Sequence, residues 1–177
     1  MEHNDKIIIT GSGNVAFYVY KFASLLEYNI VMIDNDEEML TPERFPLAGE
    51  LILGDIVENI SGYDITRDDS IVIVTRRHKF DEAVLKTVIF SPARYIGVLS
   101  NRRQVGSYFN KLTAMGVADE RIEKVHAPIG LDLGGQKAAE IALSVVAEIQ
   151  AVKYRRSGGF MLIKSRHSEK EERDELF

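Results

Sequence analysis

Residues 8–26 read IITGSGNVAFYVYKFASLL, which combines a short apolar run, a turn with two glycines and a stretch of helical period. An apolar run followed by Gly11-x-Gly13-x-x-Ala16 and a helix is the pattern of a dinucleotide-binding turn. The first glycine permits the tight bend, and the second lets the backbone approach a phosphate at the positive end of the helix. The residues expected to surround that phosphate are Gly11, Ser12, Gly13, Asn14 and Val15.

An acidic residue lies where this kind of fold places the ribose of a nucleotide. Asp34 ends the apolar run NIVMID, 23 positions after Gly11. A carboxylate there accepts hydrogen bonds from a ribose diol, and with Asn35 and Asp36 beside it a 2′-phosphate would be repelled. The sequence therefore favours NAD or another adenosine ligand over NADP. Two alternatives stay open, namely that the turn holds nothing and that Asp34 only caps a loop.

Short apolar runs alternate with longer stretches of helical period along the whole chain. The predicted strands are IIIT at 7–10, NIVMID at 29–34, ELIL at 50–53, SIVIVT at 70–75 and RYIGVL at 94–99, with a further segment from Val125. This alternation indicates βαβ units, and strands that are apolar throughout are typical of a parallel sheet covered on both faces. We predict an α/β fold, namely a Rossmann-like, doubly wound, mostly parallel sheet of about six strands with helices on both faces.

Apolar stripes of helical period mark the first and last helices. The first stripe is Val15, Ala16, Val19, Phe22, Ala23 and Leu26, and the last is Ala138, Ile141, Ala142, Val145, Ile149 and Val152. Residues 80–90 and 102–115 are predicted crossover helices. We expect a Rossmann-like domain over 1–156 and a C-terminal extension over 157–177, in which 160–163 pairs as an edge strand or lies on the sheet and SEKEERDELF forms a charged tail.

Composition excludes several classes of function. The net charge of −5 gives no support to general nucleic-acid binding, and the absence of cysteine removes disulfides, thiolate metal sites and a thiol nucleophile. The four histidines are too far apart in sequence to suggest a metal site, and Ser12 and Ser100 have no evident catalytic base. No apolar run reaches the length of a membrane span. We therefore expect a cytoplasmic protein without a catalytic nucleophile, which favours a function other than that of an enzyme.

Polar residues follow the other predicted strands, where ligands bind in open parallel sheets. These residues are Asp55 after the third strand, Thr75, Arg76, Arg77 and His78 after the fourth, Arg102 and Arg103 after the fifth, and Gly130 and Asp132 after Val125. Arginine forks match phosphate and carboxylate geometry, so four of them around one site could neutralise a phosphorylated ligand. His78 could assist a proton transfer or coordinate a ligand, and the alternative is that it is polar surface.

Five segments together resemble the Rossmann domain of the XdhC/CoxI family, the xanthine dehydrogenase accessory factors. They are TPERFP at 41–46, LILGD at 51–55, Thr75-x-x-His78-x-x-Asp81, YIGVLSNRR at 95–103 and HAPIGLDLGGQKAAEIALSVVAEI at 126–149. The resemblance implies a chaperone-like protein that binds molybdenum cofactor, as molybdopterin or its dinucleotide. It further implies that the protein assists sulfuration of the cofactor with a cysteine desulfurase and delivers it to a molybdenum hydroxylase.

The sequence departs from that family at three points. Arg76 and Arg77 stand where a histidine and an acidic or amide residue are common, and Ser100 stands where glycine is frequent. The N-terminal module of the family, which often contains cysteine, is not in this sequence, so delivery would need a separate chain; a homodimer is a further alternative. Two other functions stay open: an NAD-dependent oxidoreductase, and a nucleotide-sensing domain resembling those of potassium-uptake regulators.

Overall fold

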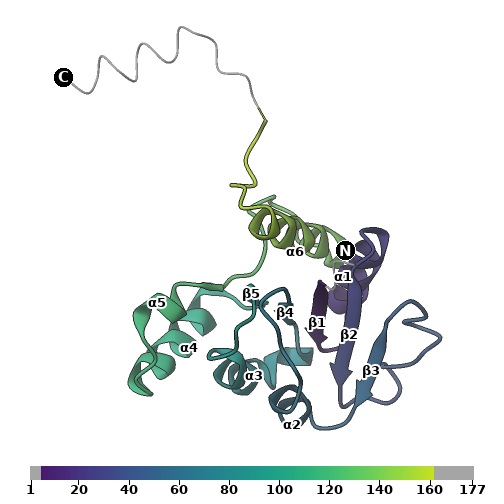
Figure 1. The fold of residues 1–177 in the computed structure, drawn as a ribbon, viewed down its shortest axis with the longest axis horizontal. Coiled ribbons are helices and arrows are strands. Elements are labelled where there is room, and N and C mark those ends of the chain that lie inside the picture. The colour runs from purple at the N-terminus through teal and green to yellow at the C-terminus, as the bar shows by residue number, and fades with distance from the viewer. Residues whose placement is uncertain (1–4, 162–177) are drawn as a thin grey trace, which may run out of the picture.

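The computed structural model describes residues 5–161, and its centre is a six-stranded sheet (Figure 1). The strands are β1 Lys6–Thr10, β2 Asn29–Asp34, β3 Glu50–Leu53, β4 Ser70–Ile73, β5 Tyr95–Val98 and β6 Val125–His126. Their order is β3-β2-β1-β4-β5-β6, and every pairing is parallel. This is the doubly wound order, in which the direction of winding reverses between β1 and β4. The predicted Rossmann-like α/β fold is confirmed.

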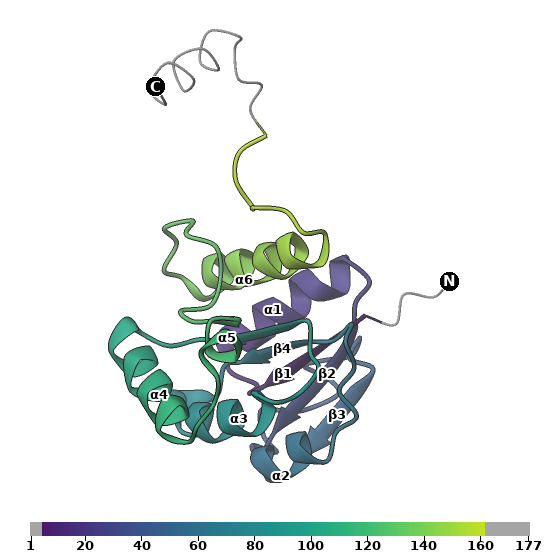
Figure 2. The ribbon, with the colours of Figure 1, turned by 60° about the vertical axis from the view of Figure 1, so that its left-hand side comes forward.

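Helices cover both faces of the sheet. They are α1 Asn14–Leu25, α2 Ile56–Ser61, α3 Asp81–Val88, α4 Arg102–Ala114, α5 Asp119–Ile122 and α6 Ala138–Lys153, with a 3-10 turn η1 at Arg76–His78. Figure 2 shows α1 and α6 along one face, and α2, α3 and α4 on the other. The crossover helices predicted over 80–90 and 102–115 are present as α3 and α4. The connection between β2 and β3 contains turns and no helix.

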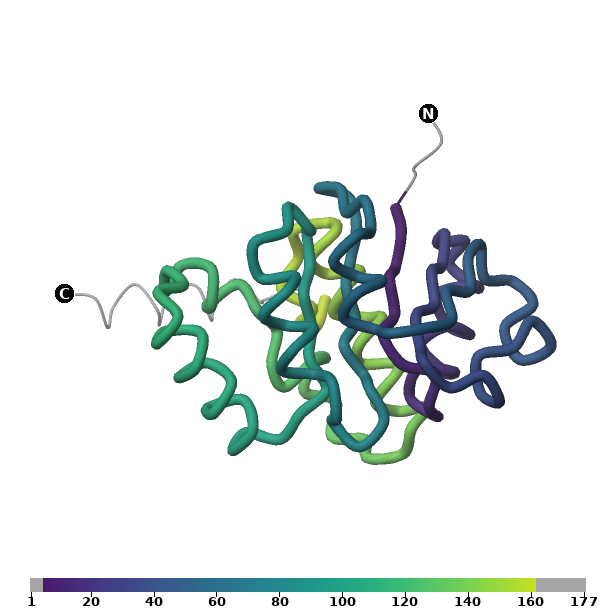
Figure 3. The backbone as a smooth tube through the Cα atoms, turned by 90° about the horizontal axis from the view of Figure 1, so that it is seen from below, coloured from purple at the N-terminus to yellow at the C-terminus, as the bar shows by residue number. Residues whose placement is uncertain are grey.

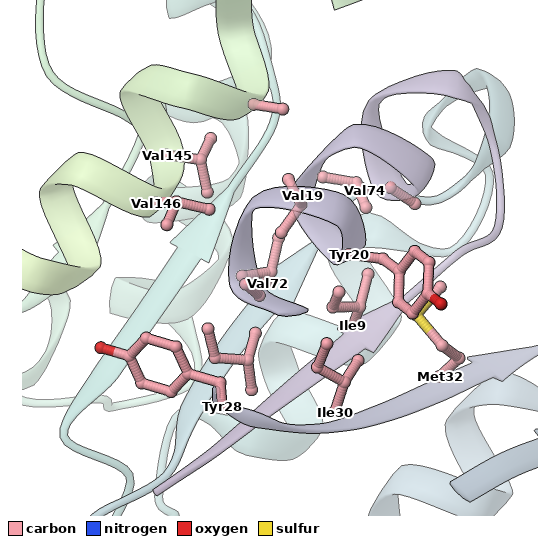
Figure 4. Close-up of a cluster of buried hydrophobic side chains, with 14 of the residues drawn as sticks. Ile9, Val19, Tyr20, Tyr28, Ile30, Met32, Val72, Val74, Val145 and Val146 are labelled. Atoms are coloured by element: carbon pink, nitrogen blue, oxygen red, sulfur yellow. The ribbon is translucent and has the colours of Figure 1, made fainter. Parts of the chain in front are cut away.

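The hydrophobic core consists of one cluster on each face of the sheet. In Figure 4, Val19 and Tyr20 of α1 and Val145 and Val146 of α6 surround strand residues such as Ile9. All five side chains are buried, and burying one such side chain contributes about 1.5–3 kcal/mol. The second cluster packs α3 and α4 against the opposite face. These two clusters hold the loops at the strand ends in fixed positions.

The edges of the sheet differ from the sequence prediction. β3 forms one edge, so its residues are exposed or half-buried and not covered on both faces as predicted. Figure 3 shows β3 and the segment before it at one side of the molecule, and α4 and α5 at the other. The predicted stripe of the first helix is wrong at Leu26, which is 46% exposed because α1 ends at Leu25. Tyr20, which that stripe omits, is buried.

Among residues 154–161, the described part of the chain after α6, none adds to the sheet. Phe160 is 94% and Met161 102% exposed, so for these two residues the predicted docking is wrong. The reason is geometric, because the chain leaves the end of α6 in a direction away from the sheet (Figure 1). Residues 162–177, which include the rest of the predicted docking segment and the charged tail, lie outside the described residues.

Candidate functional site

The two glycines between β1 and α1 have different structural roles. Gly11 has φ +113°, and a Cβ there would lie 2.9 Å from the Val74 carbonyl carbon and 3.1 Å from the Thr75 Cα. Only glycine therefore lets this turn lie against the end of β4. Gly13 has φ −69°, and no atom lies within 4 Å of the Cβ position. The space in front of Gly13 is open, so a ligand could approach the backbone there.

The open space adjoins the start of α1. Gly13 is the N-cap residue, and as a glycine it has no side chain that could accept a hydrogen bond from the first turn of α1. The N–H groups of Asn14 and Val15, in the first turn, have no acceptor within the helix, and the helix dipole makes this end positive. The arrangement suits a phosphate or another anion.

Asp34 connects the ends of β1 and β2. Its Oδ2 accepts a hydrogen bond from Ser12 Oγ at 2.6 Å, and its Oδ1 accepts one from the Asn35 N–H at 2.7 Å. The residue is only 6% exposed. Each carboxylate oxygen retains a second lone pair, so acceptance from a ribose hydroxyl stays a prediction that requires the ligand to reach a mostly covered group.

Arg44 is a site residue that the sequence analysis did not single out. Its Nη1 donates to the carbonyl oxygens of Ser12 and Met39, and its guanidinium stacks on the rings of Phe17 and Phe45 at 5.3 and 5.1 Å. Burial, followed by the charge of Arg76, lowers the pKa of Arg44 below its ordinary value. Arg44 belongs to the segment TPERFP, which the sequence analysis quoted for its family resemblance. Because this segment is a loop without helical or strand periodicity, the sequence did not indicate where the Arg44 side chain points.

The loop after β4 brings Arg76 and Arg77 next to Asp34. Arg77 and His78 adopt left-handed backbone angles, with φ of 54° and 57°. Arg76 Nη2 lies 2.5 Å from Asp36 Oδ2, so part of its charge is compensated within the protein. Asp34, Asn35, Asp36, Ile56, Arg76, Arg77, Lys79 and Phe80 line a cavity of about 320 Å³, which we call the β4 cavity.

A buried carboxylate holds that loop in place. Asp81 is fully buried, and its Oδ1 accepts hydrogen bonds from the Thr75 N–H at 3.1 Å and Thr75 Oγ1 at 2.5 Å. Its Oδ2 lies 2.8 Å from His78 Nδ1. Burial raises the pKa of Asp81, and the hydrogen bonds from Thr75 and His78 oppose that effect. Thr75 and His78 thus support the loop conformation, and contact of either with a ligand remains a prediction.

Arg102, Gly130 and Asp132 line a different cavity, of about 450 Å³, beyond β5 and β6. We call it the β5 cavity. A Cβ on Gly130, at φ +97°, would lie 3.2 Å from the Ser144 Cβ, so the loop can pack against α6 only with glycine here. The Gly130 N–H donates to Glu148 Oε2 at 2.9 Å, which ties the loop to α6.

Glu148 is the centre of a network beneath the β5 cavity. Its Oε2 also accepts from the Tyr95 hydroxyl at 2.5 Å, and its Oε1 lies 3.1 Å from His126 Nδ1. Burial alone would raise the pKa of Glu148, but the hydrogen bonds from His126, Tyr95 and Gly130 lower it below the ordinary value. The sequence analysis did not identify this network, because Tyr95 and Glu148 read there as ordinary positions of a strand and a helix.

The four arginines of the predicted site do not all line the same cavity. Arg76 and Arg77 line the β4 cavity and Arg102 lines the β5 cavity, whereas Arg103 is exposed on α4 and lines neither. Asp55 caps α2 by accepting a hydrogen bond from the Glu58 N–H at 2.8 Å. These residues do follow the carboxyl ends of the strands, as the sequence predicts. Their order in the sequence does not determine the direction in which each loop turns, and so it does not determine which cavity each side chain lines.

The described part of the chain contains neither a metal-binding cluster nor a membrane-spanning helix. Within residues 5–161, no group of three or more His, Cys, Asp or Glu side chains is placed to hold a metal ion. Among the helices described here, none combines the length and apolar content that crossing a bilayer requires.

The parallel sheet and its glycine turn at the switch point define a Rossmann domain. More specifically, the chain belongs to the family described as the XdhC Rossmann domain, whose model matches residues 7–149. This confirms the resemblance seen in the sequence and the relationship to xanthine dehydrogenase accessory factors.

Individual relatives agree with this assignment. The chain is 35% identical over 161 residues to the Escherichia coli (strain K12) protein named Uncharacterized protein YqeB, covering 89% of this chain and 29% of that protein. It is 24% identical over 149 residues to a Bacillus subtilis (strain 168) protein named as a probable subunit of xanthine dehydrogenase, covering 84% and 43%. A crystal structure described as a xanthine dehydrogenase from Bacillus halodurans matches with a TM-score of 0.74 and 25% identity, over 89% of this chain and 45% of that one. The chain thus spans less than half the length of each of these three proteins.

Proposed function

We propose that this chain binds molybdenum cofactor, as molybdopterin or its dinucleotide, and assists maturation of a molybdenum hydroxylase of the xanthine dehydrogenase or CO dehydrogenase type. Family membership supports the class of function, and the names of two relatives mention xanthine dehydrogenase. The observation that carries the proposal is the open space at Gly13, in front of the uncapped start of α1. An anionic group is the ligand that such a helix end favours.

The residues present fit a ligand with a phosphate or pyrophosphate. The backbone N–H groups of Asn14 and Val15 would hold the phosphate, and Arg76 and Arg77 would add charge from the β4 cavity. The β5 cavity follows along the same carboxyl edge of the sheet and would take the remainder of an elongated ligand. When bound, the cofactor would carry the molybdenum that the recipient enzyme needs, and this chain would orient and shield it.

Delivery requires partners, which belong to the same proposal. The recipient would be the molybdenum hydroxylase, and a cysteine desulfurase would have to supply the sulfur directly, because this sequence has no cysteine that could carry it as a persulfide. A separate chain with the remaining module of the family, or a second copy of this chain, would complete the assembly.

An adenosine ligand such as NAD is the second candidate. Asp34 favours it, because an acidic residue at the end of β2 is positioned for a ribose diol and retains free lone pairs. Use of NAD as a hydride carrier would also need residues that orient a substrate. NAD binding is therefore the alternative to binding of molybdenum cofactor. It would make the chain either a nucleotide-sensing domain or an oxidoreductase.

A binding panel separates these proposals. The protein would be titrated anaerobically with molybdenum cofactor, NAD, NADH, NADP and AMP, and binding followed by calorimetry and thermal shift. We expect saturable binding of molybdenum cofactor that Arg76→Gln weakens. The control Lys21→Gln removes one positive charge from the exposed side of α1 and should leave affinity unchanged. Tight binding of NAD or AMP without any binding of molybdenum cofactor would replace the first proposal with the second.

A further inference from the structure

A second group of cations lies at the amino ends of the strands, whereas the proposed cofactor site lies at their carboxyl ends. Arg67 precedes β4, Arg94 directly precedes β5, and Lys124 directly precedes β6, so all three lie at the amino ends of parallel strands. Two adjoining cavities of about 640 and 650 Å³ open here and share Ser91 and Arg94 among their lining residues. We call this pair of cavities the basic groove.

The charge of the basic groove contrasts with that of the whole protein. Its cationic lining residues are Arg67, Arg94, Arg121, Lys124, Lys153 and Arg155. The acidic lining residues are only two, Asp68 and Glu123, whereas the chain as a whole has a net charge of −5. A local surplus of this size on an acidic protein selects an anionic partner.

Part of the positive charge is not used within the protein. Arg94 and Lys153 are held by the buried Asp5, at 2.8 and 2.6 Å. Arg67 and Arg155 form no ion pair with any residue of the described chain. These two arginines are exposed and available to a ligand.

The groove also contains apolar and hydrogen-bonding groups. Phe90 is 59% exposed, and the Arg121 guanidinium lies 5.5 Å from the centre of its ring. Phe90 thus offers an exposed aromatic ring beside a cation within the groove. Ser91 Oγ is buried and has no hydrogen-bond partner among the described residues.

We propose that the basic groove binds an acidic segment of a partner protein, with an apolar side chain of that segment on Phe90. Exposed aromatic and arginine side chains are the types enriched at protein interfaces, and carboxylates would pair with Arg67 and Arg155. Two cavities side by side suit an extended segment better than a single small anion. Because the groove lies at the amino ends of the parallel strands and the glycine turn at their carboxyl ends, partner and cofactor can be bound at the same time.

The test uses a fluorescein-labelled peptide of alternating glutamate pairs and leucines, followed by fluorescence anisotropy with the full chain. We expect saturable binding that weakens as salt is raised. Arg67→Glu and Arg155→Glu should each lower affinity by about fivefold or more, and Phe90→Ala should lower it without a change of charge. Lys21→Glu, which makes the same charge change on α1, should lower it by less than about twofold.

Each other outcome would overturn the proposal. Absence of saturable binding, or equal losses in Arg67→Glu and Lys21→Glu, would show that the groove does not select acidic segments. Competition by a single-stranded oligonucleotide at the same concentration as unlabelled peptide would assign the groove to nucleic acid. Binding of molybdenum cofactor, measured with the same variants, reports on the proposed function, so a failure of the peptide experiment is distinguishable from a failure of that function.

Discussion

The two glycines of the turn lead to opposite predictions for stability and binding. At Gly11, an alanine would need a backbone angle of +113° and would press its Cβ against backbone atoms of Val74 and Thr75, which cannot rotate away. The unfavourable backbone angle costs about 1–3 kcal/mol, and the overpacking adds about 1–3 kcal/mol. Gly11→Ala should therefore lower the free energy of unfolding by about 2–6 kcal/mol. For a chain of this size, that lowers the Tm by about 4–24 °C.

Gly13→Val should leave the fold intact and damage the ligand site. The backbone angles of Gly13, φ −69° and ψ −171°, are open to any residue, and no atom lies within 4 Å of the Cβ position. Only the preference for glycine over an aliphatic residue at an N-cap is lost, which costs below about 1 kcal/mol. The side chain would fill the space in front of α1, so affinity for a phosphorylated ligand should fall at least about tenfold, equivalent to about 1.4 kcal/mol.

The assay is thermal unfolding of each variant, followed by titration with AMP and with molybdenum cofactor. Gly106→Val is the matched control, because Gly106 on the exposed side of α4 also has no atom within 4 Å of its Cβ position. A folded Gly13→Val variant that binds both ligands like the wild type would refute the site. A wild-type Tm for Gly11→Ala would refute the account of how the turn packs on β4.

Three further predictions concern buried groups. The pKa of Glu148 is lowered because hydrogen bonds from His126, Tyr95 and Gly130 outweigh the opposing effect of burial, so its carboxylate stabilises the fold above about pH 4.5 and loses that effect in acid. Glu148→Gln should thus lower the free energy of unfolding by about 1.5–3 kcal/mol at neutral pH. When the free energy of unfolding is measured by urea denaturation at a series of pH values, its decrease in acid should be smaller for this variant. Burial raises the pKa of Asp81, so its contribution to stability declines as pH rises from 3.8 through the raised pKa, and Asp81→Asn should remove that decline in the same series. Val145→Asp, on the buried side of α6, should destabilise the protein by several kcal/mol in the same assay, and an unchanged midpoint would contradict the packing of α6.

The sheet could be predicted from the sequence because of where its strands lie. β1, β2, β4 and β5 are covered on both faces, and burial on both sides requires uninterrupted apolar runs that the sequence shows directly. β3 has an equally apolar sequence but forms an edge, and nothing in ELIL distinguishes the two positions. Helix α2 was not predicted, because its six residues are too few for a helical period to be recognised.

The candidate site could be predicted only as a set of strand ends. Gly11, Gly13 and Asp34 belong to a spacing that the fold imposes, so their positions follow from the pattern alone. Arg44 lies on a long connection without regular structure, where side-chain direction depends on tertiary contacts with Phe17 and Phe45. The same dependence explains why the arginines of one expected site line two cavities.

Net charge limited the sequence analysis in a different way. A total of −5 argues against a basic protein, but it averages over surfaces that the fold separates. Arg67 and Arg94 belong to connections that precede β4 and β5, and Lys153 comes from the end of α6, far away in sequence. Because the strands are parallel, these segments meet at the amino ends of the strands, where their positive charges add. The local potential at those ends is therefore a property of the topology, and a partner would respond to it and not to the total charge.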